Sequence, residues 1–198
     1  MREQPYVNSE YCIFVAEVAS TCNEVLLTEY LMEHSKNETE KAYVLGQQLE
    51  AFRTTLYRQT MFAEFEWMMH QRAEKGEAVT AQSLCDVYYE LNRKYYGEAV
   101  VSDEEIAMEW ARIPHFYTPY YVYQYATGYA AAVAFADKIL TQKETAVQPY
   151  IDYFLKGGRS KDPIDLLREA GVDMAGTDAI ERALAKFEEG VERFSGVV

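Results

Sequence analysis

One carboxylate stands at the edge of an apolar helical stripe near the start of the sequence. The apolar residues of this segment recur at the three- and four-residue steps of one buried helix face, and they are Tyr11, Phe14, Val15, Val18, Cys22, Val25 and Leu26. Glu17 directly precedes Val18. Because an unpaired buried charge is costly, three explanations fit this carboxylate: solvation at the rim, a buried Arg or Lys partner, or a metal ion. Spacing alone favours the first two.

A second group of side chains that could do chemistry lies in the run PHFYTPYYVYQYATGY, residues 114–129. Tyr120, Tyr123 and Thr127 are three and four residues apart, so they share one face of a helix. Two interpretations remain open. The tyrosines form an aromatic packing stripe, or they join the loop histidine, His115, in donating hydrogen bonds to a developing oxyanion. Each such donor contributes roughly 2.7 to 4 kcal/mol in peptide hydrolysis.

Other catalytic and metal-binding classes lack their patterns in this sequence. The residues four positions after the three histidines are Glu38, Glu74 and Pro119, so there is no HExxH motif. A di-iron bundle needs Glu-x-x-His pairs, whereas the residues three positions before the histidines are Leu31, Trp67 and Arg112. Phosphate-loop, G-x-S-x-G and paired Cys and His signatures are also missing from the sequence.

The segment FVAEVASTCNE resembles the segment that follows the catalytic helix of oligoendopeptidase F, in the thimet-oligopeptidase-like family of zinc metallopeptidases. In that family an HExxH helix supplies two histidines and a glutamate, and the glutamate of an EVAS-type segment is the third protein ligand of zinc. The resemblance implies that this ligand is Glu17. Glu24 is either a solvated residue, which we favour, or a hydrogen-bond partner behind the site. Because the HExxH helix is missing, we interpret the chain as the carboxy-terminal portion of such an enzyme.

The loop and tyrosine run resembles, independently, the substrate-binding loop and tyrosine helix of the same metallopeptidases. There, a loop histidine and one or two tyrosines contact the peptide carbonyl and stabilise the tetrahedral intermediate. The resemblance assigns these roles to His115, Tyr120 and Tyr123. Tyr117 and Tyr121 are the alternative choices, because this loop is shorter in oligoendopeptidase F than in the thimet-type enzymes. The stretch FLKGGRSKDPIDLLREAGVDM shows the same resemblance, which therefore covers essentially the whole chain.

Helical periods, caps and breakers predict the elements that hold these side chains. We expect helices at about residues 8–34, 38–74, 80–96, 103–113, 120–142, 146–155, 163–169 and 179–194. The first two are joined by a short turn and should be antiparallel. No segment alternates as a strand does, so the sequence predicts an all-α multi-helix bundle with one helical domain over residues 1–198. By resemblance, it is the carboxy-terminal helical part of a thermolysin-like zinc peptidase that lacks the HExxH helix.

Composition and charge limit the partners. The chain has 198 residues, of which 49% are hydrophobic and 26% charged, as in an ordinary protein with a packed core. A formal charge of −13 argues against nucleic acid or an anionic membrane as a partner. No apolar run reaches membrane length and no leader is visible, so we expect a cytoplasmic protein. Cys12, Cys22 and Cys85 lack CxxC spacing, which indicates reduced, buried thiols.

Two functions from different classes follow. The leading hypothesis is the carboxy-terminal portion of a zinc metalloendopeptidase that hydrolyses oligopeptides, inactive alone and holding Zn²⁺ weakly or not at all without the half that carries HExxH. The alternative is a non-catalytic helical module for peptide binding or assembly. Without its partner half, the chain should expose apolar surface. We therefore expect a homo-oligomer whose contact includes the region around Phe14, Glu17 and residues 120–125.

Overall fold

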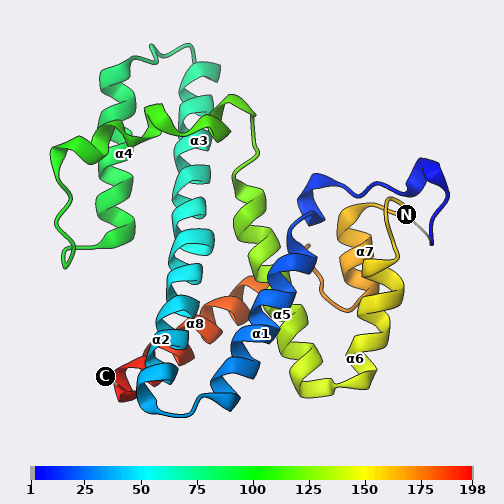
Figure 1. Ribbon diagram of the computed structural model, residues 1–198. Coiled ribbons are helices and arrows are strands. Elements are labelled where there is room, and N and C mark those ends of the chain that lie inside the picture. The colour runs from blue at the N-terminus through cyan, green and yellow to red at the C-terminus, as the bar shows by residue number, and fades with distance from the viewer. Residues whose placement is uncertain (1–2, 198) are drawn as a thin grey trace. The chain divides into compact units, whose positions relative to one another are not determined.

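The fold consists of helices, as the computed structural model of residues 3–197 shows (Figure 1). The α-helices are α1 (Val18–His34), α2 (Glu38–Ala51), α3 (Arg58–Glu74), α4 (Ala81–Tyr96), α5 (Tyr123–Gln142), α6 (Glu144–Pro149), α7 (Pro163–Glu169) and α8 (Asp178–Val197). Shorter 3₁₀ or π segments are η1 (Tyr6–Asn8), η2 (Ile13–Val15), η3 (Phe52–Tyr57), η4 (Glu104–Arg112), η5 (Pro114–Tyr117) and η6 (Tyr150–Leu155). Within the described range there is no strand, and the predicted all-α class is confirmed.

The chain divides into two compact units. The first contains Met1–Arg53 and Thr127–Val198, and the second contains Thr54–Ala126. Along the sequence, one boundary falls inside η3 and the other inside α5. A single domain over the whole chain stays a prediction.

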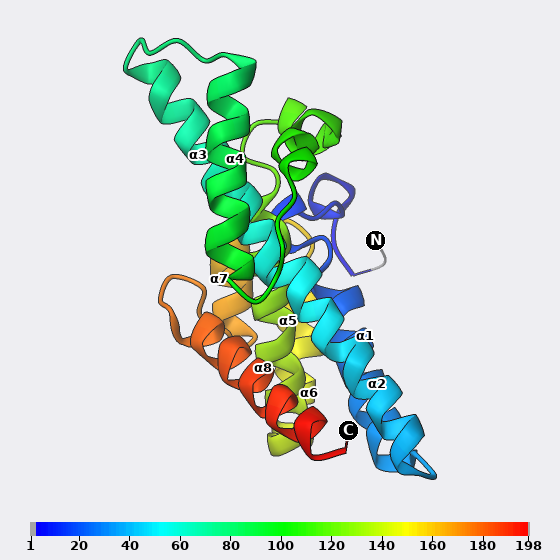
Figure 2. The same cartoon turned by 90° about the vertical axis from the view of Figure 1, so that its left-hand side faces the viewer.

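In the first unit, α1 and α2 lie side by side and antiparallel after a short turn (Figure 2). Asn37 caps α2 by accepting a hydrogen bond from the Glu40 amide at 2.9 Å. On its other side α2 packs against α8, where the rings of Phe52 and Phe187 are 5.5 Å apart. This arrangement agrees with the predicted antiparallel pair.

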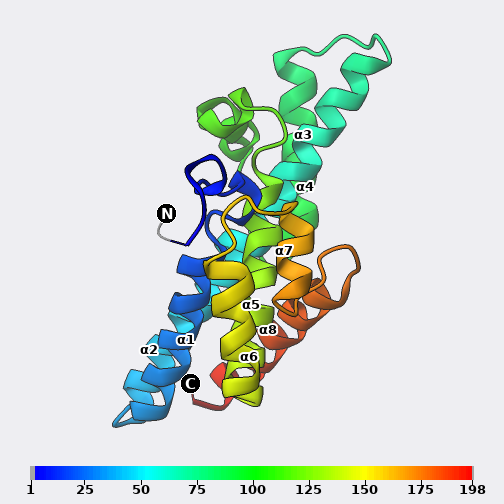
Figure 3. The ribbon, with the colours of Figure 1, turned by 90° about the vertical axis from the view of Figure 1, so that its right-hand side faces the viewer.

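A run of small residues in α5 forms the middle of the first unit. Residues 128–137 are all buried, and alanines in this run let α1 and the chain around η6 and α7 approach closely (Figure 3). From α1, Val18 and Cys22 contribute fully buried side chains to this core. From η6, Tyr150 and Phe154 stack near Phe135 of α5 at ring distances of 5.0 and 5.4 Å. The first turns of α1 are therefore fixed by apolar burial.

The second unit is built on α3 and α4, with η4 packed against α4. Its core consists of Met61, Phe62, Phe65, Val87, Tyr88, Leu91, Ile113 and Val122. One buried carboxylate, Glu109 of η4, accepts hydrogen bonds from the Tyr88 hydroxyl and from Arg58 Nη2, each at 2.5 Å. Burial, followed by the Glu109 carboxylate, raises the pKa of Tyr88. This paired cluster ties η4 to both helices.

Two predicted helix starts are wrong. The first helix begins at Val18 rather than near residue 8, since η1 and η2 are separate 3₁₀ turns and the helical ladder opens at the Glu17 carbonyl, which accepts from the Thr21 amide at 3.0 Å. The tyrosine helix begins at Tyr123 rather than at residue 120. Tyr120 has a φ of +56°, which a right-handed helix cannot contain.

Three predicted helices have a different internal geometry. The predicted helix 38–74 contains the π segment η3, and the predicted helix 146–155 ends in the π segment η6. Residues 104–112 form a 3₁₀ helix rather than an α-helix, and the Asp103 carboxylate caps it by accepting from the Ile106 amide at 3.1 Å. The preceding residue, Ser102, donates from its hydroxyl to Asn92 Oδ1 at 2.9 Å.

The prediction of reduced, buried thiols holds in part. Cys12, Cys22 and Cys85 are all free, although only Cys22 is fully buried. Burial raises the pKa of the Cys22 thiol. In the part of the chain that the structure describes, no helix combines the length and apolar character needed to cross a bilayer.

The capping box of α4 generates a stability prediction. The Thr80 hydroxyl accepts from the Ser83 amide at 3.2 Å, while the Ser83 hydroxyl accepts from the Thr80 amide at 3.0 Å. Thr80→Ala leaves the Ser83 amide without its side-chain acceptor, so it should lower the free energy of unfolding by about 1 kcal/mol in urea titrations. Glu90→Ala, an exposed change in the same helix, is the matched control. An equal loss in both variants would contradict this role for the cap.

Candidate functional site

Glu17 occupies the N-terminal end of α1, and its side chain is exposed although the next residue, Val18, is fully buried. Ser20, one turn further on, lies with its hydroxyl 3.1 Å from Glu17 Oε2 and 3.0 Å from the Glu17 carbonyl. All ion pairs found among residues 3–197 use other carboxylates. A buried Arg or Lys partner is therefore not the explanation for Glu17, and solvation or a metal remains.

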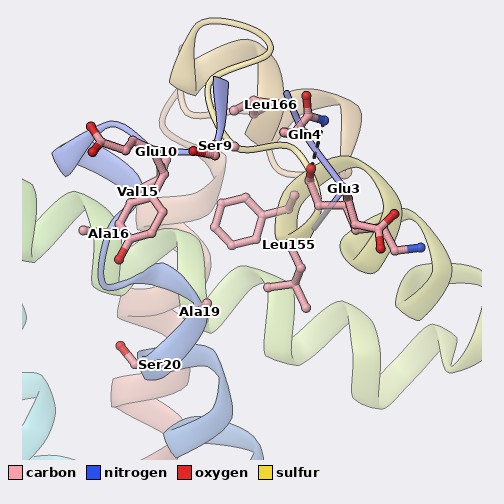
Figure 4. A pocket seen from close by; sticks show the side chains of 14 residues that line it. Glu3, Gln4, Ser9, Glu10, Val15, Ala16, Ala19, Ser20, Leu155 and Leu166 are labelled. Carbon is pink, nitrogen blue, oxygen red and sulfur yellow. Dashed lines mark hydrogen bonds between the residues drawn. The ribbon is translucent and has the colours of Figure 1, made fainter. Parts of the chain in front are cut away.

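A pocket of about 700 Å³ adjoins the first turn of α1 within the first unit (Figure 4). Its apolar lining includes Val15, Ala16, Ala19, Phe154, Leu155 and Leu166. Glu3, Glu10 and Lys156 add charged groups, and Ser20 lines the pocket beside Ala19 of α1. Ser20 thus borders this hollow and contacts the Glu17 carboxylate as well.

The metal donors present make up only part of a zinc site. Among residues 3–197, no three His, Cys, Asp or Glu side chains are grouped closely enough to hold a metal ion. Catalytic zinc takes three protein ligands and one open position. An exposed carboxylate with a hydroxyl donor beside it fits one of these ligands, because ligating carboxylates are usually held by hydrogen bonds. The carboxylate of Glu17 is therefore chemically compatible with one ligand position, and residues 3–197 do not group the three donors that a complete site needs.

In the second unit, His115 is grouped with two tyrosines of the following segment. The His115 ring stacks on Tyr121 with centroids 5.6 Å apart and an interplanar angle of 11°. The Tyr125 hydroxyl lies 3.3 Å from His115 Nε2 and 3.3 Å from the Tyr121 hydroxyl. His115 itself remains exposed. This cluster presents an imidazole and phenol hydroxyls, which are groups able to donate to an oxyanion.

Tyr120 is held by a different set of contacts. Its backbone N–H donates to Oε1 of the buried Glu66 at 2.7 Å, and its ring stacks on His70 at a centroid distance of 4.8 Å. Tyr123 is the first residue of α5. Tyr120 and Tyr123 are 48% and 40% exposed, so an aromatic core stripe does not describe these rings. His115 and Tyr120 thus have different sets of contacts, and Tyr123 follows at the start of α5.

The family is decided by direct comparison. Residues 1–186 match the family model described as Peptidase family M3. The chain belongs to peptidase family M3. It is 55% identical over 188 residues to Oligopeptidase PepF of Bacillus subtilis (strain 168), covering 95% of this chain and 28% of that protein. It is 46% identical over 195 residues to the chromosomal Oligoendopeptidase F of Lactococcus lactis subsp. cremoris, covering 98% of this chain and 32% of that protein.

A solved structure agrees with this assignment to peptidase family M3. The crystal structure of oligoendopeptidase-F from Enterococcus faecium superposes with a TM-score of 0.89 and 49% identity, covering 94% of this chain and 36% of that one. The predicted resemblance to oligoendopeptidase F is confirmed. The chain spans about a third of the length of these relatives, and it is a fragment relative to them.

Sequence reasoning overlooked three polar residues that contact the predicted site residues of this M3 chain: Ser20, Glu66 and Tyr125. Ser20 could have been found from its position one helical turn after Glu17. Glu66 stands out because it shares a helix face with Phe62 and directly follows Phe65, in a stretch that should be buried. Tyr125 carries no such local signal, since its contact with His115 depends on the turn at Tyr120.

The remaining candidates lie apart from these contacts or support them indirectly. Glu24 is exposed, as favoured from the sequence. Burial, with the nearby Glu24 charge, raises the pKa of Tyr129. His34 is exposed at the end of α1, where its Nδ1 lies 2.8 Å from the Tyr30 carbonyl. Tyr117 is 86% exposed, so it is free of core packing.

Proposed function

We propose that this chain is the carboxy-terminal portion of a zinc metalloendopeptidase that hydrolyses oligopeptides, and that it is inactive without the remaining portion. The observation that carries the proposal is the exposed carboxylate of Glu17, which has a hydroxyl donor but no two further metal ligands beside it in residues 3–197. An M3 peptidase fragment that spans 28% of a full-length relative is consistent with a divided site.

Each proposed residue has a separate task. Glu17 would hold zinc as the one protein ligand from this chain, and Ser20 would keep its carboxylate oriented. Zinc, when bound, supplies Lewis-acid chemistry to the scissile peptide bond. His115, Tyr120 and Tyr123 would donate hydrogen bonds to the substrate carbonyl oxygen as it gains negative charge. Contacts with Tyr121 and Tyr125 limit the rotation of the His115 ring, which preserves its position.

Zinc binding distinguishes a divided site from a complete one. The isolated chain should show no tight zinc site in equilibrium dialysis, because one carboxylate cannot replace three protein ligands. With a separately expressed amino-terminal portion, zinc-dependent hydrolysis of a fluorogenic oligopeptide should appear. Ser20→Ala, which removes only the hydrogen-bond partner of the ligand, should then weaken zinc binding roughly 10–100-fold. Glu17→Ala removes the ligand itself and should weaken zinc binding by more than this. Glu24→Ala is the control, and should leave zinc affinity unchanged.

Two results would count against this proposal. Stoichiometric, tight zinc bound to the isolated chain through Glu17 would contradict the divided site. A stable complex of the two portions without hydrolysis would favour the alternative, a non-catalytic helical module for peptide binding or assembly.

Kinetics test the proposed oxyanion donors. In the reassembled enzyme, Tyr123→Phe or His115→Ala should lower kcat by roughly 10²–10³-fold with little change in KM, since the lost bond is strongest in the transition state. Tyr153→Phe removes a hydroxyl from a half-exposed tyrosine elsewhere in the chain and should leave kcat unchanged. If Tyr117→Phe lowered kcat to a similar degree and Tyr123→Phe left it unchanged, the oxyanion donor would be Tyr117 instead of Tyr123.

Self-association of the isolated chain is a further part of the proposal. Near Phe14 and Glu17, the side chains of Tyr11 and Ile13 are 63% and 53% exposed. Exposed apolar surface of this kind favours association, so sedimentation should show an oligomer. Ile13→Ser should shift it toward monomer. Phe14→Ser is a poorer test because Phe14 packs against the core of the first unit. A clean monomer in the unmodified chain would disprove the association.

A further inference from the structure

We propose that Glu66 of α3, with His70 one turn further along, is a positioning residue that fixes the backbone of Tyr120 and hence the start of the tyrosine helix. The consequence for substrate binding rests on the function proposed above. The conformational part does not, since it concerns only residues of the second unit.

Burial of the Glu66 carboxylate calls for an explanation. Glu66 is 2% exposed, and Phe62 and Phe65 of the same helix are also buried, at 3% and 1% exposure. A charged or polar group in such surroundings costs free energy unless it is hydrogen-bonded. Its partner is the backbone N–H of Tyr120, 54 positions away, at 2.7 Å. This bond therefore links α3 to a distant loop rather than stabilising α3 itself.

Tyr120 needs such a contact because its backbone is strained. Its φ of +56° lies in the left-handed region, which residues with a Cβ rarely adopt. Strain of this kind persists only where the surroundings impose it. Glu66 and His70 are four residues apart on α3, so both reach the same place: the carboxylate binds the Tyr120 amide, and the imidazole stacks on its ring with an interplanar angle of 25°.

The contact fixes exposed groups rather than filling a core. The Tyr120 ring stays 48% exposed, so the bond to Glu66 does not serve to bury it. An apolar side chain at position 66 would fill this space without the cost of a buried carboxylate. The carboxylate instead fixes the backbone conformation at Tyr120 through its hydrogen bond to the amide. From that turn, Tyr121 stacks on His115, and α5 begins at Tyr123.

Hydrogen exchange of the Tyr120 amide tests the clamp in the chain itself. Glu66→Leu removes the acceptor, so exchange of this amide should accelerate about tenfold relative to the unmodified chain. Glu66→Gln keeps a neutral acceptor oxygen of similar size, and its acceleration should be smaller. Glu64→Leu is the matched control on the same helix, because Glu64 binds Lys94 and Tyr95 instead. It should not alter Tyr120 exchange.

The outcome at the amide decides the conformational claim. Unchanged Tyr120 exchange in a folded Glu66→Leu variant overturns it. If the leucine variant does not fold, the Glu66→Gln variant decides alone, since a carboxylate accepts a stronger hydrogen bond than an amide oxygen. Equal exchange in the glutamine variant and the unmodified chain then overturns the clamp.

Hydrolysis by the reassembled enzyme tests the consequence for substrate binding. Glu66→Leu should lower kcat/KM by at least tenfold, with partial rescue in Glu66→Gln, whereas Glu64→Leu should retain full activity. Unaltered kcat/KM in Glu66→Leu, together with faster Tyr120 exchange, overturns the positioning role. Absence of hydrolysis with the unmodified chain counts instead against the proposed function, and the exchange result still decides the clamp.

Discussion

Close packing around the small-residue run of α5 is the constraint on which the first unit depends. A Cβ added at Gly128 would lie 3.8 Å from Val18 Cγ2, an ordinary van der Waals distance, so a methyl group on α5 would just reach α1 at this point. Val18 and Cys22 are fully buried there, and the rings of η6 fill the other side of Phe135. Larger side chains in this run would force the helices apart. The location of Glu17 thus follows from apolar packing one residue away from it.

The internal arrangement of the second unit depends on buried polar groups as well as on its aromatic core. Glu109 is paired with Arg58 and Tyr88, while Glu66 binds a backbone amide. Hydrogen bonds are directional, so each of these carboxylates selects one arrangement among the many that aromatic packing alone would allow. In this unit the apolar core supplies the free energy of folding, and the carboxylates determine where the 3₁₀ segments and the loop at Tyr120 lie.

The sequence predicts local features of this chain well because their causes are local. Thr80 caps α4 and Gly97, with a φ of +71°, ends it, as the sequence indicates. The turn at Tyr120 was not predictable from its neighbours, since its causes lie on α3. No sequence pattern indicated η3 or η6, which are π segments of six residues each beside ordinary α-helix. The metal-binding role proposed for Glu17 rests on resemblance, because spacing alone favours a solvated or paired carboxylate.

The exposed state of Glu17 also bears on how zinc binding and folding are related. In small zinc domains the binding free energy of the metal is the folding free energy, because the ligands are not arranged beforehand. Here α1 is anchored by Val18 and Cys22, and Ser20 already contacts the carboxylate. Solvent can stabilise the charge of Glu17, so in the proposed site α1 would not need the metal in order to keep its place in the core. In the proposed divided site, a carboxylate arranged beforehand would lower the ordering cost of assembly, since only the remaining ligands would have to be brought to it.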